Sequence, residues 1–135
     1  MEKEEIQRRV EEGMARKKSG KYNCAQAVTS VYCDVAGLDE ELAMRLAGAY
    51  GTGMGCLEGT CGALVGAGMI LGMASANRVE AMKRMRMVME AFRQRNGATI
   101  CRELKGVGTG VELRPCTLCV ADACEMLGKA LGSRR

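Results

Sequence analysis

The sequence predicts an all-α fold, a compact bundle of six or seven helices around one glycine-rich central helix. Apolar residues recur at spacings of three and four along most of the chain, and no segment shows the alternation typical of a β-strand. The chain has one proline, at position 115, so long stretches are free to be helical. Because 135 residues is the length of one domain, we expect residues 1–135 to form a single helical domain.

The first predicted helix covers residues 2–18. Its apolar residues Ile6, Val10 and Met14 lie four apart. Its charges are acidic at the start and basic at the end, which complements the helix dipole. A Ser-Gly pair ends this helix.

The second predicted helix begins at Asn23 and runs to about Gly37. Gln26, three residues after Asn23, completes a capping box, which places Cys24 in the first turn. A short third helix is expected over about residues 39–49, with an aspartate as its N-cap.

The predicted central helix follows a glycine-rich loop. Thr60 is expected to be its N-cap and Cys61 its first residue, which places a thiol at the positive end of the helix dipole. No residue from 61 to 76 is charged, so this helix must be covered on nearly every side. A membrane span is the alternative, but the run is shorter than the roughly 20 residues needed to cross a bilayer, so we expect no membrane insertion.

Glycine inside a helix costs about 1 kcal/mol relative to alanine. Four glycines of the central helix therefore need a compensating reason, and close approach by neighbouring helices is the simplest. They are Gly62, Gly66, Gly68 and Gly72.

The preceding loop, residues 48–59, contains five glycines. Glycines let backbone N–H groups approach a phosphate, so an anion-binding loop is one interpretation. No strand pattern precedes the loop, and it has neither the Rossmann spacing nor the Gly-Lys-Ser/Thr ending of a P-loop. A flexible connector is the favoured interpretation.

Three further helices are predicted. The first covers about residues 78–95, with apolar residues at spacings of three and four. Thr99 is expected to cap a short helix with Cys101 in its first turn. Pro115 opens the last helix with Cys116 beside it, because proline suits the first helical position.

Composition excludes several classes of protein. The chain is 47% hydrophobic and 27% charged, as is typical of a soluble globular protein. Aromatic residues make up 3%, so eleven methionines and the aliphatic residues must fill the core. The net charge of +4 is spread along the chain, and few aromatic residues are present to stack on bases, so we expect no nucleic acid partner.

The chain has eight cysteines, below the density of a small secreted disulfide scaffold. The first twelve residues are largely charged and do not resemble a signal peptide. We therefore expect a reducing, cytoplasmic setting, where many cysteines indicate metal or thiol chemistry. The chain has no histidine, which excludes histidine acid–base catalysis, mixed Cys/His zinc sites and histidine-ligated haem.

Four of the eight cysteines fall in the first turn of a predicted helix: Cys24, Cys61, Cys101 and Cys116. A helix N-terminus lowers the pKa of a thiol and favours the thiolate, the form that attacks disulfides and binds metals. If the four N-termini converge, they would form either two redox pairs or one four-sulfur metal site. The alternative is that buried cysteines fill gaps in a methionine-rich core.

The remaining cysteines allow further pairings. Cys119 follows Cys116 in a Cys-x-x-Cys spacing that opens a helix, as a dithiol redox centre requires. No histidine follows Cys119, so the usual covalent haem attachment is excluded. Cys56 is a candidate resolving thiol, while Cys33 and Cys124 are expected in the core.

Four segments of the chain together resemble the redox-active family named for its C-GCAxxG-C-C pattern. They are Asn23-Cys24-Ala25-Gln26-Ala27, Thr60-Cys61-Gly62-Ala63-Leu64-Val65-Gly66, Cys101-Arg102-Glu103-Leu104-Lys105-Gly106, and Cys116 ahead of Val120-Ala121-Asp122-Ala123. The resemblance covers residues 22 to about 128 and implies redox or metal chemistry. By position, it implies the same four characteristic cysteines, and it leaves open which thiols pair.

These observations lead to two functional hypotheses. In the first, the chain is a cytoplasmic thiol-disulfide oxidoreductase that exchanges with a redox partner protein or a small thiol. Cys61 is its nucleophile, activated by helix dipoles and nearby lysine or arginine, and another clustered thiol resolves the intermediate. In the second, Cys24, Cys61, Cys101 and Cys116 bind zinc or an iron–sulfur cluster. A helical interaction module with incidental cysteines is the third possibility.

The apolar surface also suggests a quaternary structure. The helix over residues 78–95 carries Met87 beside Met82, Met85 and Met89, which is more apolar surface than one small domain readily covers. Closed homodimers are the commonest way to bury such a surface, so we expect a homodimer with this helix at or near the interface.

Overall fold

The computed structural model describes residues 1–132, and no strand occurs among them, which confirms the all-α prediction. The elements are α1 (Lys3–Lys18), α2 (Cys24–Val31), α3 (Glu40–Ala47), the π-helical turn η1 (Gly53–Leu57), α4 (Gly62–Ala74), α5 (Arg78–Asn96), α6 (Cys101–Lys105) and α7 (Cys116–Leu131). None of the described helices is both long and apolar enough to cross a membrane.

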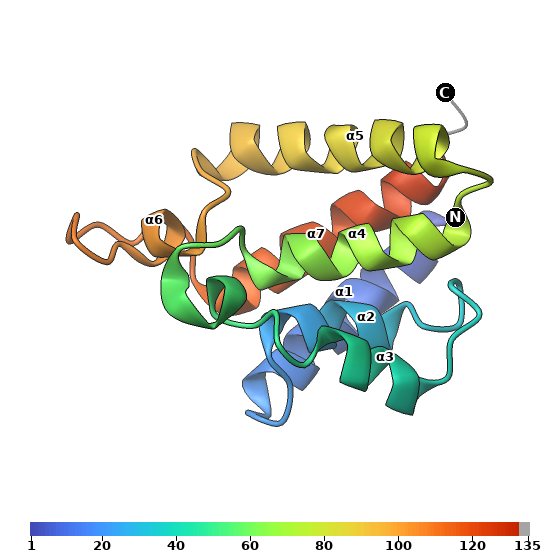
Figure 1. Cartoon of the computed structure of the whole chain (residues 1–135), viewed down its shortest axis with the longest axis horizontal. Helices are drawn as coiled ribbons and strands as arrows, with labels where there is room; N and C mark the ends of the chain where they lie inside the picture. The colour runs from blue at the N-terminus through green and yellow to red at the C-terminus, as the bar shows by residue number, and fades with distance from the viewer. Residues whose placement is uncertain (133–135) are drawn as a thin grey trace.

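The helices are arranged around two neighbouring helices, α4 and α7 (Figure 1). Helix α5 covers one side of this pair, while α1, α2 and α3 lie on the other side. Leu64, Ile70 and Leu71 of α4 are fully buried, as are Val120 and Leu127 of α7. The expectation of one central glycine-rich helix is therefore not confirmed, because α7 shares the centre and packs against α1, α2, α4 and α5.

Helix α2 has the predicted start but ends earlier than predicted. Asn23 and Gln26 form the capping box, with the side chain of each accepting from the backbone N–H of the other. The helix ends at Val31 rather than near Gly37, because Tyr32 leaves the helical conformation. The Tyr32 hydroxyl donates a hydrogen bond of 2.7 Å to the carbonyl of Cys124, which holds this turn against α7.

The predicted N-caps of α4 and α6 are wrong by one residue. Thr60 forms an isolated antiparallel bridge with Ile100, so Cys61 becomes the N-cap of α4 and Ile100 that of α6. The Cys61 N–H donates to the Thr99 carbonyl at 2.8 Å, and the Cys101 N–H donates to the Gly59 carbonyl at 3.0 Å. These two bonds tie the starts of α4 and α6 together. Pro115 is the N-cap of α7, with Cys116 as its first residue.

Close helix approach explains two of the four glycines of α4. A Cβ at Gly66 would lie 2.7 Å from the backbone carbonyl oxygen of Ala25 on α2, and one at Gly62 would lie 2.5 Å from the carbonyl of Tyr50. A Cβ at Gly68 would meet only the flexible side chain of Met85, at 3.3 Å, and one at Gly72 would meet nothing within 4 Å. The N-terminal half of α4 is therefore the part that needs glycine to reach α2.

Candidate functional site

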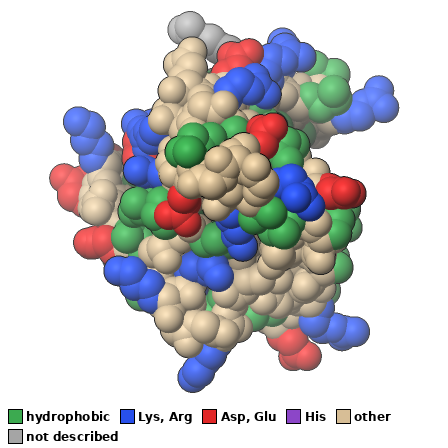
Figure 2. Space-filling view, turned by 90° about the vertical axis from the view of Figure 1, so that its left-hand side faces the viewer, with side chains coloured by type: hydrophobic (Ala, Val, Ile, Leu, Met, Phe, Trp, Pro, Cys, Tyr) green, Lys and Arg blue, Asp and Glu red, His purple; other side chains and the backbone are tan. Residues whose placement is uncertain are grey.

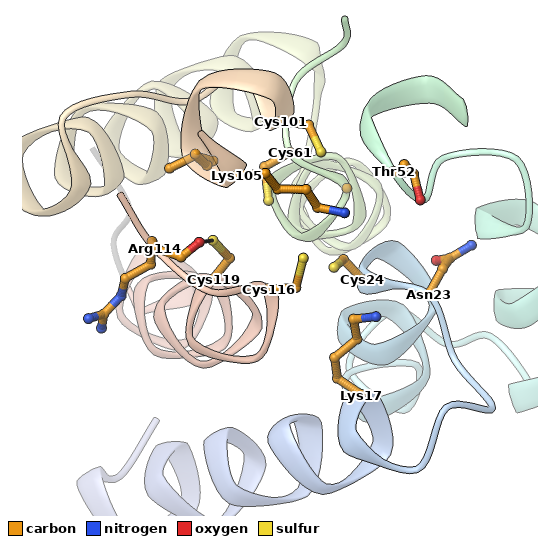
Figure 3. A pocket seen from close by; sticks show the side chains of 12 residues that line it. Lys17, Asn23, Cys24, Thr52, Cys61, Cys101, Lys105, Arg114, Cys116 and Cys119 are labelled. Atoms are coloured by element: carbon orange, nitrogen blue, oxygen red, sulfur yellow. Dashed lines mark hydrogen bonds between the residues drawn. The ribbon is translucent and has the colours of Figure 1, made fainter. Parts of the chain in front are cut away.

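A small cavity lies where the N-terminal ends of α2, α4, α6 and α7 meet, at one end of the molecule (Figures 1 and 3). Its volume is about 40 Å³, room for one or a few water molecules and much less than a drug-sized ligand needs. All four cysteines singled out from the sequence line it, and Cys119 is a fifth. The other lining residues are Lys17, Asn23, Thr52, Gly62, Leu104, Lys105 and Arg114.

Helix starts position these thiols. Cys24, Cys101 and Cys116 are each the first residue of their helices, and Cys61 is the N-cap of α4. Cys119 lies one turn after Cys116, and residues three apart on a helix lie on the same face. The convergence expected from the sequence is therefore present, with one more thiol than expected.

Cys24 and Cys116 form the first thiol pair: both line the cavity, and each is the largest single influence on the pKa of the other. The Cys24 thiol, together with the ammonium groups of Lys105 and Lys17, lowers the pKa of Cys116 to about 5 against the opposing effect of burial. The neighbouring Cys116 and burial raise the pKa of Cys24. At neutral pH the pair therefore holds one proton, on Cys24, and a thiolate on Cys116.

Cys61 and Cys119 form the second thiol pair. The neighbouring Cys119 thiol lowers the pKa of Cys61, and the backbone N–H groups of Ala63 and Leu64 contribute, while burial opposes them. The pKa of Cys119 is raised by the neighbouring Cys61 and by burial. Only 4% of Cys61 and 1% of Cys119 is exposed, so neither thiol is open to a large partner.

Cys119 is also anchored from the loop before α7. Its Sγ donates to the carbonyl of Arg114 at 3.7 Å. The Arg114 guanidinium donates two hydrogen bonds of 3.0 Å to the carboxylate of Asp122, which is buried and also accepts from Arg95 and Asn96. This carboxylate therefore fixes the loop that closes one side of the cavity.

Cys101 is held in the cavity wall by the glycine-rich loop. A Cβ at Gly53 would lie 2.5 Å from the Cys101 Cβ, and Gly53 has a φ of +56°, so a side chain at this position would be strained and would clash. Burial raises the pKa of Cys101, although Lys105 opposes that effect. The loop expected to be a flexible connector thus packs closely on one of the site residues.

The chain was compared with known proteins. Residues 22–130 match the model of a family described as "putative redox-active protein (C_GCAxxG_C_C)". The chain belongs to this family. The match confirms the resemblance and includes all five cysteines of the cavity. No curated protein and no solved structure matches the chain significantly.

Three cysteines of this family member lie outside the cavity lining. Cys124 is fully buried between α7 and α1, as expected, and burial raises its pKa to about 12. Cys33 is only partly buried, in the turn after α2, so its assignment to the core was wrong. Cys56 is exposed on η1, and its thiol donates to the carbonyl of Gly53 at 3.7 Å.

Sequence reasoning missed the two lysines of the site and gave Cys119 too small a role. Cys119 had a usable signal, the Cys-x-x-Cys spacing at a helix start. Lys17 and Lys105 lie at the ends of α1 and α6, where basic residues are common for reasons of helix dipole alone. Figure 2 looks onto this end of the molecule and shows lysine and arginine side chains scattered among acidic and apolar ones.

The geometry does not support the metal hypothesis. Among residues 1–132, no three side chains of metal-ligating type are arranged to hold a metal ion. Instead, four of the five cavity thiols fall into two pairs, and within each pair one thiol has a lowered pKa and the other a raised pKa. A pair consisting of one thiolate and one thiol is an arrangement suited to disulfide chemistry.

Proposed function

We propose that this member of the family is a thiol-disulfide oxidoreductase in which Cys116 is the attacking thiolate and Cys24 the resolving thiol. One observation carries the proposal: the two thiols line one small cavity together with Lys105 and Lys17, and these neighbours lower the pKa of Cys116. The thiolate is the nucleophile in disulfide exchange, and its partner is already within reach.

The reaction has two steps. First, the Cys116 thiolate attacks one sulfur of a substrate disulfide, which forms a mixed disulfide and releases the other substrate sulfur as a thiolate that takes up a proton. Second, Cys24 loses its proton to solvent and attacks Cys116 Sγ, which forms the Cys24–Cys116 disulfide and releases the second substrate thiol. The substrate gains two electrons from the two cysteines and two protons, of which Cys24 gives up one to solvent and solvent supplies the other.

The choice of nucleophile follows from exposure. The sequence favoured Cys61, but Cys61 is almost fully buried, whereas Cys116 is partly exposed. An attacking sulfur must reach its target in line with the disulfide, which requires access. We therefore propose that Cys116 meets the substrate first.

We further propose that the substrate disulfide belongs to a redox partner protein or to a small thiol compound in the cytoplasm. The cavity of about 40 Å³ cannot enclose a whole small molecule, so the substrate would place only its sulfur atoms at the mouth. Lys105 and Lys17 would stabilise the thiolate that leaves.

The test is disulfide mapping with glutathione disulfide as the probe. Reduced protein is mixed with the probe, quenched with acid at intervals and mapped by mass spectrometry. We expect a transient glutathione adduct on Cys116, followed by a Cys24–Cys116 disulfide. Cys116→Ser should slow formation of any intramolecular disulfide at least tenfold, while Cys33→Ser, outside the cavity, should leave the rate unchanged. A Cys116→Ser protein that reacts as fast as wild type would refute the proposal.

We also propose a homodimer with α5 at the interface. Val79, Met82 and Met87 on this helix are exposed, which leaves apolar surface available for a second copy. Sedimentation at micromolar concentrations tests this, and a species that remains monomeric on tenfold concentration would contradict it.

A further inference from the structure

We propose that Cys61 and Cys119 form a second redox site that receives the disulfide from the Cys24–Cys116 pair, so that each chain can take up two disulfides in succession. This inference rests on the function proposed above for Cys24 and Cys116. It assigns a role to two buried thiols that the first exchange does not use.

The geometry provides a continuous path between the pairs. All four thiols line the same small cavity, so each sulfur lies close to the others (Figure 3). Cys116 and Cys119 are one turn apart on the same face of α7, which is the spacing of a dithiol that can close into a disulfide. Cys119 and Cys61 line the cavity side by side with them, and each has the largest effect on the pKa of the other. The proposed order of exchange is therefore Cys24, Cys116, Cys119, Cys61.

Burial determines how the second pair can react. Cys61 and Cys119 are almost inaccessible, so an external disulfide cannot approach them directly. Only Cys116, which is partly exposed, connects the buried pair with the outside. Exchange inside the cavity is therefore the available route.

Cys124 shows how this pair differs from ordinary core cysteines. Cys124 is also fully buried, but it lies in the hydrophobic core beside Gly13 of α1, and burial raises its pKa. Cys61 instead lies at a helix N-cap where two backbone N–H groups and a second thiol stabilise its thiolate. A cysteine that only filled space would not need these donors.

The transfer is an internal exchange in two steps. Cys119 attacks Cys116 Sγ of the Cys24–Cys116 disulfide and displaces Cys24, and the departing Cys24 sulfur takes up the proton that Cys119 loses. The Cys61 thiolate then attacks Cys119 Sγ, which forms the Cys61–Cys119 disulfide and displaces Cys116 as a thiolate. One disulfide breaks as another forms, so no electrons are gained or lost inside the protein. Cys24 and Cys116 are again reduced and can react with a second substrate disulfide.

Charge favours transfer in this direction. Lys105 and Lys17 stabilise the Cys116 thiolate and so stabilise the reduced form of the outer pair. The negative charge on Cys116 opposes a second thiolate on Cys61, and burial opposes it as well. Oxidation of the inner pair removes this buried charge, so we expect the disulfide to reside there at equilibrium.

The experiment counts and maps disulfides in a Cys33→Ser/Cys56→Ser protein. Cys33 and Cys56 lie outside the cavity and are partly exposed and exposed, respectively, so removing them leaves only the cavity thiols and the buried Cys124. Reduced protein is titrated with glutathione disulfide, quenched with acid, alkylated and mapped. We expect one disulfide per chain early in the titration, with a Cys24–Cys116 intermediate, and two at the end, Cys24–Cys116 and Cys61–Cys119. Cys101 and Cys124 should remain alkylated throughout.

The outcomes separate the two proposals. A titration that ends at one disulfide with Cys61 still free, either Cys24–Cys116 or a Cys116–Cys119 disulfide formed by way of Cys24–Cys116, supports the proposed function and overturns the relay. A titration in which Cys24–Cys116 never forms overturns the proposed function itself.

Two variants test the route. Cys61→Ser keeps a good N-cap side chain, and it should stop the titration at one disulfide. Cys116→Ser should slow formation of the Cys61–Cys119 disulfide at least tenfold, because both transfer steps pass through Cys116. Cys124→Ala, at a fully buried thiol outside the cavity, is the control and should still give two disulfides. Formation of Cys61–Cys119 at the wild-type rate in Cys116→Ser would overturn the relay.

Discussion

Replacing Cys24 by alanine removes the largest contribution to the low pKa of Cys116, the neighbouring Cys24 thiol, which we expect to donate a hydrogen bond to the Cys116 thiolate. Cys24→Ser is the matched control, because a serine hydroxyl can still donate a hydrogen bond to the thiolate. Both variants shorten or remove one buried side chain at the start of α2 and leave the capping box of Asn23 and Gln26 in place. The comparison therefore isolates the donor.

The size of the effect follows from the thiolate fraction. With a pKa of about 5, Cys116 is about 99% thiolate at pH 7, whereas an unperturbed thiol would be on the order of 1%. Loss of one hydrogen bond to a charged group typically changes a pKa by about one to two pH units, and Lys105 and Lys17 remain in Cys24→Ala. We therefore expect the midpoint to rise by about one to two pH units in Cys24→Ala and by less in Cys24→Ser.

The assay is the rate of Cys116 alkylation by iodoacetamide between pH 4 and 9, followed by peptide mapping. The rate rises with pH as the thiolate forms and reaches a plateau above the pKa, so a raised pKa moves the midpoint to higher pH. The midpoint is the informative quantity, because a more basic thiolate is also a stronger nucleophile and raises the plateau. Equal midpoints in wild type and Cys24→Ala would refute the assignment of Cys24 as the donor.

Three further predictions test the site and the fold. Lys105→Met should also raise the alkylation midpoint of Cys116, because it removes a positive charge beside the thiolate, and an unchanged midpoint would count against its role. In urea unfolding, Gly66→Ala should lower the free energy of unfolding by about 1–3 kcal/mol, because the new Cβ meets a backbone carbonyl. Gly72→Ala should raise the free energy of unfolding by about 1 kcal/mol, because its Cβ meets nothing and alanine is the better helix former. Asp122→Ala should lower the free energy of unfolding by about 2–4 kcal/mol, because Arg95 and Arg114 lose a buried ion-pair partner. Glu125→Gln, at the surface, should lower it by under about 1 kcal/mol, and equal losses in the two variants would contradict this account.

Local signals in the sequence predicted the elements well. The capping box at Asn23 and Gln26, and Asp39 as an N-cap, are satisfied within one helical turn, so neighbouring residues determine them. The cap at Thr60 was wrong because its backbone pairs with Ile100, a partner forty positions away that no local pattern reveals. The early end of α2 has the same kind of cause, the contact of Tyr32 with α7.

The site could be predicted in part for a similar reason. Four cysteines at helix starts indicated convergence, because helix N-termini are recognisable one at a time. Which thiols pair depends on how α2, α4 and α7 pack together, and so Cys24 could not be assigned to Cys116, nor Cys61 to Cys119, from spacing. The lysines came from the ends of α1 and α6, and only the fold shows that these ends reach the cavity.

The absence of histidine from the chain explains why each thiolate is stabilised by other groups. A thiol that must be ionised near neutral pH usually relies on a neighbouring imidazole, and here a second thiol, backbone N–H groups and lysine ammonium groups take that part. In each pair the more buried or more weakly stabilised sulfur has the raised pKa and keeps the proton. Because the lysines lower the pKa of Cys116, whereas a thiol and backbone N–H groups lower that of Cys61, the two thiolates are stabilised unequally. This inequality favours a reduced outer pair and an oxidised inner pair, which is the direction that returns Cys116 to its reactive form after each exchange.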